Sequence, residues 1–234
     1  MKHYSVLFID LDNTLYDFSA NSMAAYREVY ALLDYRRWFD DFEQYFAIYE
    51  EYNVQLWKRY AAGEITKDFL NAERYAHPLR VKNVPDAETL GARFGDEAMI
   101  RLPLGKRLMP HAREVLEYLY SRYRLYILSN GFTELQSHKM QSARIGHYFE
   151  GVVLSEDIGV NKPHPAIFEY ALQVAGVEAD DAVMIGDNYD VDIKGALDVG
   201  MDQIFYNIDK DVMEAGRVLP TYTIYSLLEL KDIL

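Results

Sequence analysis

Four short polar segments carry the side chains in this sequence that could perform chemistry. The first contains Asp10 and Asp12, which are separated by one residue and directly follow the apolar run Tyr4–Ile9. In an extended chain, residues two apart point to the same side, so both carboxylates could converge on one reacting group. One could act as a nucleophile and the other as a general acid or base. Acidic turn residues are also common after strands, so the pair alone does not separate the two interpretations.

The second and third segments could bind an anion such as phosphate. Ser129, Asn130 and Gly131 follow the apolar run Leu125–Leu128 and offer a hydroxyl, an amide side chain and backbone N–H groups. Lys162 lies in a later loop, and its ammonium could neutralise a phosphate or a nearby carboxylate. Ser-Asn-Gly is also a common turn sequence, and loop lysines are usually solvated. Taken alone, the second segment therefore favours an ordinary turn and the third a solvated lysine.

The fourth segment, Gly186–Asp192, supplies a second group of carboxylates after the apolar run Val183–Ile185. Together with Asp10 and the backbone carbonyl of Asp12, its aspartates could form an oxygen-lined site for Mg²⁺, which prefers such ligands and keeps several waters. Acidic residues in a first helical turn also complement the helix dipole, so Asp190 and Asp192 could cap a helix instead.

The elements that would position these segments alternate between strands and helices. Short runs rich in Val, Ile, Leu and Tyr predict strands over Tyr4–Ile9, Leu125–Leu128, Val152–Leu154, Val183–Ile185, Ile204–Tyr206 and Thr221–Ile224. Helical patterns cover Ala112–Arg122, Ala166–Ala175 and Ile193–Val199. We therefore predict an α/β fold with a Rossmann-like parallel sheet, in which the polar segments meet at the carboxyl ends of the strands.

The region from about Ser19 to about Met99 breaks this alternation. It has no convincing strand pattern, and aromatic and aliphatic residues such as Tyr26, Tyr30 and Leu33 recur at steps of three and four residues. The pattern predicts a helical domain of residues 16–99, inserted into a core domain made of residues 1–15 and 100–234.

Charge and composition narrow the class of protein. The 24 basic residues against 37 acidic ones give a net charge of −13, so we expect neither nucleic acid nor an anionic membrane as a partner. The chain has no cysteine, which excludes disulfides, thiolate zinc sites and a thiol nucleophile. No apolar run approaches the ~18–20 residues of a membrane span, and a cytoplasmic protein is expected. A monomer is expected, and a dimer stays open.

The joint order of the four segments is far more specific than any one of them. Nucleophile and acid, hydroxyl, lysine and metal carboxylate follow successive strands, and in this respect the sequence resembles the haloacid dehalogenase-like hydrolase superfamily. The family motifs match Asp10–Thr14, Ser129, Lys162 and Gly186–Asp192, and the resemblance covers the predicted core domain. It implies a Mg²⁺-dependent enzyme, and it implies that the helical insert is a C1-type cap that reads the leaving group.

The resemblance also implies a role for each site residue. Asp10 would attack phosphorus and form an aspartyl-phosphate, while Asp12 would protonate the leaving group and later activate water. Ser129 and Lys162 would hold and neutralise the phosphoryl group. The metal ligands would be Asp10, Asp12, Asp187 and Asp192, and the residues lining the substrate would be Asn13, Thr14, Asn130 and Gly131.

The sequences around the first two motifs narrow the expected class of substrate. The segments DLDNTLYDF and SNGFTELQSHKM resemble the bacterial pyrimidine 5′-nucleotidase subgroup, which implies nucleoside monophosphates such as dUMP, UMP or TMP. A sialic acid phosphate phosphatase branch of the family shares the Asn-Thr-Leu sequence, so a sugar phosphate is the alternative substrate. An acid at position 12 favours phosphate ester cleavage over dehalogenation, because a halide leaves without a proton. A function that is not enzymatic also stays open: the protein could be a non-catalytic, phosphate-binding regulatory module.

Two groups of residues have competing interpretations. The many aromatic residues of the insert could stack on a nucleobase, or they could simply fill the core of a helical bundle. His138 and Lys139 follow the Ser129 loop on a predicted helix, and we expect both to be solvated.

Overall fold

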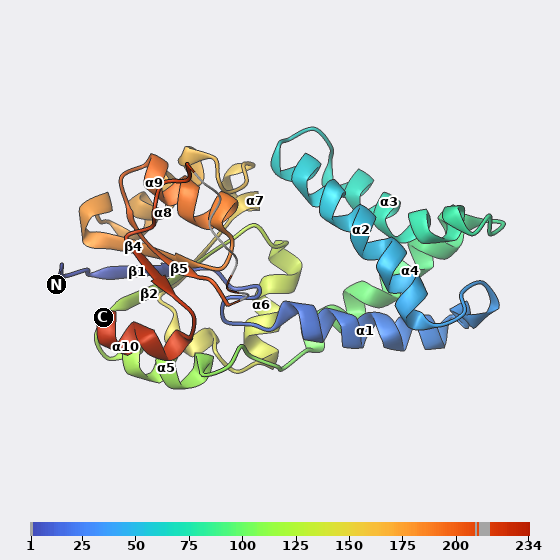
Figure 1. Cartoon of the computed structure of the whole chain (residues 1–234), viewed down its shortest axis with the longest axis horizontal. Helices are drawn as coiled ribbons and strands as arrows, with labels where there is room; N and C mark the ends of the chain where they lie inside the picture. Colours follow the sequence, from blue (N-terminus) through green and yellow to red (C-terminus); the bar gives the residue numbers. More distant parts are fainter. Residues whose placement is uncertain (1, 209, 211–215) are drawn as a thin grey trace. The chain divides into compact units, whose positions relative to one another are not determined.

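The computed structural model describes residues 2–208, 210 and 216–234, which form two compact units. One unit contains the residues up to Ser19 together with Lys106–Leu234, and the other is Ala20–Gly105. Figure 1 shows the first as a sheet covered by helices and the second as a group of helices.

The first unit is built on a six-stranded sheet with the order β3-β2-β1-β4-β5-β6, in which every neighbouring pair is parallel. The strands are β1 (Val6–Ile9), β2 (Arg124–Ser129), β3 (Gly151–Leu154), β4 (Ala182–Gly186), β5 (Asp202–Tyr206) and β6 (Tyr222–Ile224). Each predicted strand is present, with ends that differ by at most two residues. The predicted α/β class with a Rossmann-like parallel sheet is confirmed.

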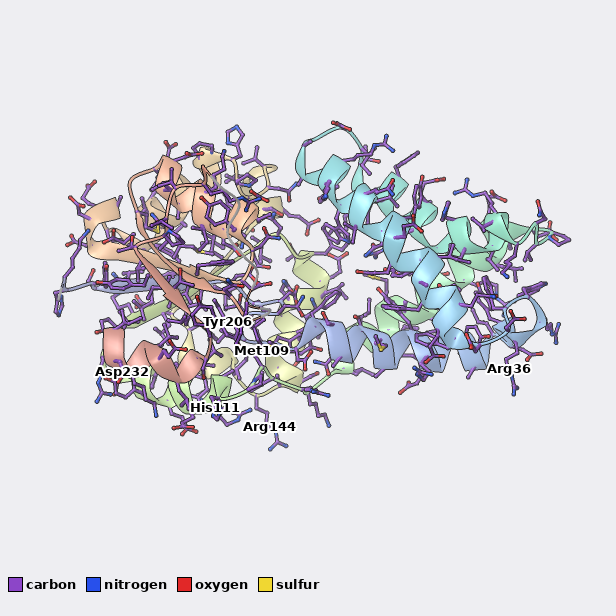
Figure 2. The ribbon with its side chains drawn as sticks, viewed as in Figure 1. Arg36, Met109, His111, Arg144, Tyr206 and Asp232 are labelled. Carbon is purple, nitrogen blue, oxygen red and sulfur yellow. The ribbon has the colours of Figure 1, made fainter. Side chains whose placement is uncertain are left out.

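Helices cover both faces of this sheet, which explains its continuous apolar strands (Figure 1). Residues of α5 (Ala112–Tyr120), α6 (Thr133–Ser142) and α10 (Leu230–Ile233) pack in one core. Tyr206 of β5 is buried in that core, and Met109 packs against it (Figure 2). On the other face, α8 (Pro165–Ala175) and α9 (Lys194–Asp198) pack in a second core.

Short helical segments complete the unit. They are α7 (Ser155–Ile158) and single turns at Gly146–Tyr148, Ala179–Asp181 and Leu227–Glu229. A π-helical turn spans Tyr189–Ile193 and leads directly into α9, where the sequence predicted one helix over Ile193–Val199. The periodic pattern predicted the helix but not the wide turn before it.

The second unit contains four helices: most of α1 (Phe18–Leu32), then α2 (Phe42–Ala61), α3 (Lys67–Val81) and α4 (Ala87–Arg101). Single turns at Tyr35–Arg37 and Leu102–Leu104 follow α1 and α4. Side chains of Asp41 and Thr66 accept hydrogen bonds from backbone N–H groups at the starts of α2 and α3, which fixes where these helices begin. None of the described helices combines the length and the apolar character needed to cross a membrane.

Most aromatic side chains of this unit form its core. Their rings lie within van der Waals reach of one another, as in the pairs Tyr26–Tyr49 and Tyr35–Tyr45, with centroids 5.1 and 5.5 Å apart. The buried members are Tyr26, Tyr30, Tyr35, Phe39, Phe42, Tyr45, Tyr49, Tyr75 and Phe94. Trp38, Phe46, Tyr52, Trp57 and Tyr60 are only half-buried. For the buried rings, the interpretation as bundle core is therefore confirmed.

Gly91 allows α3 and α4 to approach closely. A Cβ atom at this position would lie 2.7 Å from both the backbone N and the Cα of Ala76, and backbone atoms cannot rotate away as a side chain can. The close contact of these helices therefore depends on the absence of a side chain at Gly91.

We expect Gly91→Ala to destabilise the protein, although alanine favours an isolated helix by about 1 kcal/mol over glycine. Overpacking of this kind costs about 1–3 kcal/mol and should lower the urea midpoint of unfolding. Gly146→Ala is the matched control, because its Cβ would meet only Met140 Cβ, at an ordinary 3.8 Å. An unchanged or raised midpoint for Gly91→Ala would contradict the packing described.

Candidate active site

The candidate site lies at the carboxyl ends of the central strands. Asp10 directly follows β1, Ser129 ends β2 and Asp187 directly follows β4. Ile9 pairs with Ile127 on one side and Ile185 on the other, so the three strands end within two residues of the same level. The chain crosses from β1 to β2 in one direction and reaches β4 on the opposite side, and ligands of open parallel sheets bind at such a reversal.

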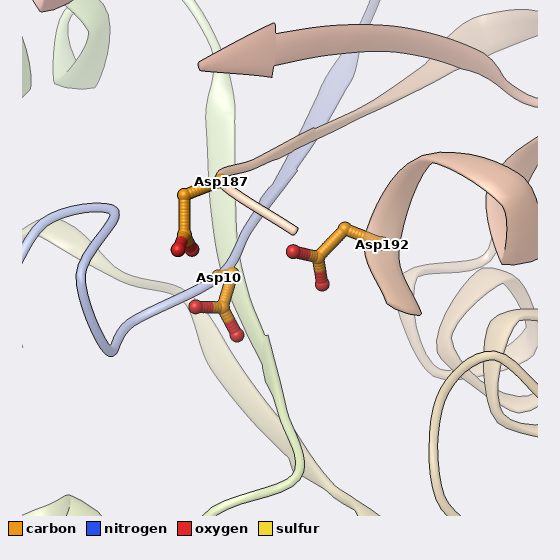
Figure 3. A group of neighbouring side chains, drawn as sticks. All are labelled: Asp10, Asp187 and Asp192. Carbon is orange, nitrogen blue, oxygen red and sulfur yellow. The ribbon is translucent and has the colours of Figure 1, made fainter. Parts of the chain in front are cut away.

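Three carboxylates gather at this edge. Oxygen atoms of Asp10, Asp187 and Asp192 all lie within 4.8 Å of one another. Figure 3 shows the three side chains as neighbours, which come from the ends of β1 and β4 and from the π-helical turn. Hard cations such as Mg²⁺ prefer such oxygen ligands, so this cluster could hold a divalent ion.

Lys162 joins two of these carboxylates from the neighbouring loop. Its Nζ donates to Asp10 Oδ1 at 2.7 Å, to Asp192 Oδ1 at 2.6 Å and to the Leu128 carbonyl at 2.6 Å. These three acceptors match the three donors of an ammonium. Lys162 is 1% exposed and Asp192 is equally buried, so the ion pairs are held out of water.

The charges of the cluster do not balance without a further cation. Three carboxylates face one ammonium, which leaves two negative charges if all are ionised. Burial raises the pKa of Asp10 well above its usual range; Lys162 opposes this rise, and the charges of Asp192 and Asp187 add to it. Burial, with the charge of Asp192, raises the pKa of Asp187 to about 7. Burial would lower the pKa of Lys162, but Asp10 and Asp192 hold it above its ordinary value. A divalent cation would supply the charge that is missing.

The loop after β1 is fixed by the side chains of Asn13 and Thr14. Asn13 has a left-handed backbone with φ of 63°, which asparagine tolerates better than most residues, and its Oδ1 accepts from the N–H and the hydroxyl of Ser19, each at 3.0 Å. Thr14 is fully buried; its hydroxyl donates to Asp187 Oδ1 at 2.8 Å and accepts from the Asp187 N–H at 3.1 Å. Both side chains hold the loop in place, and contact with substrate stays a prediction.

The loop after β2 is tied to Lys162. The Asn130 amide donates to the Lys162 carbonyl at 2.9 Å and accepts from its N–H at 2.7 Å, so it fixes the backbone that carries the ammonium. The N–H of Gly131 donates to Ser129 Oγ at 3.1 Å. The predicted substrate contacts of Asn130 and Gly131 likewise stay predictions.

Asp12 lies in a separate cluster of polar side chains. Its carboxylate accepts from Lys139 Nζ at 2.9 Å on each oxygen, and Oδ2 also accepts from Gln136 Nε2 at 3.0 Å. Gln136 Nε2 also donates to Ser129 Oγ at 2.7 Å, which connects the second predicted carboxylate to the predicted hydroxyl. Metal binding by Asp12 through its backbone carbonyl stays a prediction.

The expected solvation of Lys139 is wrong, because the side chain is only 2% exposed, whereas its neighbour His138 is exposed. Gln136 was not predicted as a site residue at all. A signal was present in the sequence: Gln136 and Lys139 fall on the same face of α6 as the buried Leu135 and Met140. A polar residue on the buried face of a helix needs a partner, and Asp12 is that partner.

The comparisons with known proteins agree with this arrangement. The family model described as haloacid dehalogenase-like hydrolase matches residues 4–200. The chain belongs to the haloacid dehalogenase-like hydrolases. The resemblance seen in its four motifs is therefore confirmed, and the chain is a hydrolase by family.

Individual relatives align over nearly the whole chain. The pyrimidine 5′-nucleotidase YjjG of Escherichia coli is 32% identical, with 97% of this chain and 96% of that protein covered. The human N-acylneuraminate-9-phosphatase is 28% identical, with 100% and 95% covered. The crystal structure of the HAD-hydrolase YfnB from Bacillus subtilis, bound to magnesium, has a TM-score of 0.87 at 27% identity and covers 99% of both chains.

The raised pKa of Asp187 gives a prediction about pH. A carboxyl whose pKa rises from its ordinary value near 4 to about 7 on folding binds protons more tightly in the folded state. The metal-free protein should therefore lose stability as pH increases between about 4 and about 7, and Mg²⁺, which requires ionised ligands, should restore it. At about 100 times its Kd, Mg²⁺ should add about 2.7 kcal/mol.

The measurement is the thermal unfolding midpoint with and without Mg²⁺ at about pH 5 and about pH 8. We expect a clear rise with Mg²⁺ only at the higher pH, and a loss of most of that rise in Asp187→Asn. Asp190→Asn is the matched control, since Asp190 is exposed in the adjoining turn and outside the carboxylate cluster. Equal rises at both pH values, or an unchanged rise in Asp187→Asn, would show that the ion binds elsewhere.

Proposed function

We propose that this protein is a Mg²⁺-dependent phosphomonoester hydrolase that acts through an aspartyl-phosphate on Asp10. The observation that carries the proposal is the pairing of Asp10 with Lys162 inside a buried cluster that still lacks positive charge. Such a cluster favours a dianionic phosphate only when a divalent cation is bound with it, and Mg²⁺ at Asp10, Asp187 and Asp192 would supply this charge.

Asp10 is suited to act as the nucleophile. Lys162 donates to its Oδ1, and Oδ2 receives no hydrogen bond from the described part of the chain, so one oxygen has free lone pairs. Lys162 would also neutralise charge that develops on the transferring phosphoryl group. Ser129, together with N–H groups of the loop that follows it, would hold the phosphoryl oxygens.

Asp12 is suited to general acid–base catalysis. Its side chain is 24% exposed and lies outside the carboxylate cluster, so it can exchange protons without disturbing the cluster. It would protonate the oxygen of the leaving group and then take a proton from the water that hydrolyses the aspartyl-phosphate. An acid is unnecessary for cleavage of a carbon–halogen bond, so Asp12 supports phosphate esters over haloacids.

We propose pyrimidine nucleoside monophosphates as the substrate class. YjjG, a pyrimidine 5′-nucleotidase, is more similar to this chain than the N-acylneuraminate-9-phosphatase is, at 32% against 28% identity. A sugar phosphate is the second candidate, supported by that second relative. We propose that the helical unit Ala20–Gly105 is the cap that selects the leaving group, and its half-buried aromatic rings and the exposed Phe69 are the ones available to contact a base.

A non-catalytic phosphate-binding module is less well supported. Such a protein would not need both aspartates after β1, yet Asp10 and Asp12 are present, each with its own lysine partner. We propose that the protein works in the cytoplasm as a monomer, on small molecules and without a nucleic acid or membrane partner.

The test is phosphate release from a panel of pyrimidine nucleotides, purine nucleotides and sugar phosphates with Mg²⁺. Asp10→Asn keeps the shape of the side chain but removes the nucleophile, and we expect activity to fall by at least about 10³-fold. Asp198→Asn, an exposed residue of α9, is the matched control and should keep wild-type activity. Activity on pyrimidine monophosphates that is lost only in Asp10→Asn is the expected result.

Other outcomes separate the parts of the proposal. If only sugar phosphates are hydrolysed, the mechanism stands and the nucleotide assignment fails. If Asp10→Asn is as active as the wild type, the assignment of the nucleophile is wrong. If the wild type releases phosphate from no member of the panel but binds Mg²⁺ and inorganic phosphate, the binding module becomes the better description.

A further inference from the structure

Lys139 has no role in the chemistry described so far, although it is one of the most deeply buried charged residues. It is 2% exposed, and within the described residues both hydrogen bonds of its ammonium go to Asp12. The rings of Phe18 and Tyr16 lie 4.5 and 5.7 Å from Nζ and cover it further. A lysine is almost never buried so completely unless it is paired, and Asp12 is the partner that holds it.

Gln136, one turn earlier on α6, holds the same carboxylate from a second direction. It is fully buried, and its Nε2 donates to Asp12 Oδ2 and to Ser129 Oγ. Gly131 leaves the room for it, since a Cβ there would lie 2.0 Å from Gln136 Nε2. One helix therefore presents two donors to Asp12, and neither is available to solvent.

The two donors do not occupy the two oxygens equally. Asp12 Oδ2 accepts from both Lys139 and Gln136, whereas Oδ1 accepts from Lys139 alone. Each carboxylate oxygen has two lone pairs, so Oδ2 is fully used and Oδ1 keeps one. The arrangement makes the two oxygens chemically distinct before any substrate binds.

We propose that Lys139 is a positioning residue that acts through Asp12: with Gln136, it fixes the carboxylate so that Oδ1 is the oxygen that exchanges the proton. This inference rests on the proposed phosphatase function. In the first step, the proton on Oδ1 passes to the leaving-group oxygen as its bond to phosphorus breaks and the bond from Asp10 to phosphorus forms. In the second step, a proton of water passes to Oδ1 as the water oxygen attacks phosphorus and Asp10 is released.

A purely structural ion pair is the competing explanation, and the two differ in which step they affect. p-Nitrophenolate leaves without a proton, so a displaced Asp12 should hardly slow phosphorylation of Asp10 by p-nitrophenyl phosphate. Hydrolysis of the aspartyl-phosphate still requires Asp12 as a base. A positioning defect therefore slows the second step selectively, whereas a general loss of structure slows both.

The main variant is Lys139→Met, which removes the charge and keeps the length of the side chain. With p-nitrophenyl phosphate and Mg²⁺, we expect a rapid burst of p-nitrophenolate within about threefold of the wild-type rate, followed by turnover reduced about 10²-fold. Phosphorylated protein, measured by mass spectrometry after acid quenching, should accumulate. Lys231→Met, which breaks an ion pair with Glu114 on α5, is the matched control and should behave as wild type.

A double mutant tests whether Lys139 acts through Asp12. In an Asp12→Asn background, Lys139→Met should reduce turnover little further, because the group that it positions is already lost. Lys139→Arg keeps the charge but not the shape, and it should recover part of the activity. This variant also serves if Lys139→Met does not fold, as judged by circular dichroism; a folded Lys139→Arg with slowed dephosphorylation supports the proposal.

Three results would overturn the positioning role. They are an equal decrease of burst and turnover in folded Lys139→Met or Lys139→Arg, unchanged kinetics in Lys139→Met, and additive losses in the double mutant. The test remains separate from the proposed function: a wild type that is active, with an inactive Asp10→Asn and an unaffected Lys139→Met, would refute only the role of Lys139.

Discussion

The ammonium of Lys162 is the contact on which the site depends. It is buried and donates to Asp10, to Asp192 and to the carbonyl of Leu128 at the end of β2, so it connects three separate parts of the chain. Buried charges are costly unless they are paired and hydrogen-bonded, and loss of one partner typically costs about 3–5 kcal/mol. Two carboxylates at the switch point of the sheet therefore require this lysine, and Asn130 fixes the backbone that delivers it.

The order of the strands brings together residues of this contact that are far apart in the sequence. Because β1 lies between β2 and β4, the loops that follow Ile9, Ser129 and Gly186 meet at one edge of the sheet. The first of these loops is more than a hundred residues away from the other two in the sequence. Parallel strands deliver backbone ends at equal heights, and short polar loops suffice to place the side chains. The helical unit could be inserted after β1 without disturbing this arrangement, since the strand pairing does not depend on it.

Much of this could be predicted from the sequence, because fully buried strands leave continuous apolar runs and because the polar loops of the candidate site directly follow them. The helical insert could also be predicted from its periodicity. The role of its aromatic residues could not, since a ring at a helical spacing is compatible with core packing and with ligand stacking, and only burial separates the two. The π-helical turn that carries Asp192 to Lys162 was equally hidden, because the hydrogen bonds of Asn188 that shape it have no periodic pattern.

Lys139 shows most clearly why the remainder needed a structure. The helical face that Lys139 shares with Leu135 and Met140 gave a signal for its burial, but nothing in the sequence indicated its partner. The partner of Lys139 is 127 residues away, in the loop after β1, and no local pattern could connect them.

The site thus contains two ammonium–carboxylate pairs with different surroundings. Lys162 lies among three carboxylates that share a deficit of positive charge, whereas Lys139 and Asp12 form a balanced pair. This difference fits the roles that we propose, because a nucleophile that needs a cation and an acid–base group that must gain and lose one proton are best kept in separate electrostatic environments.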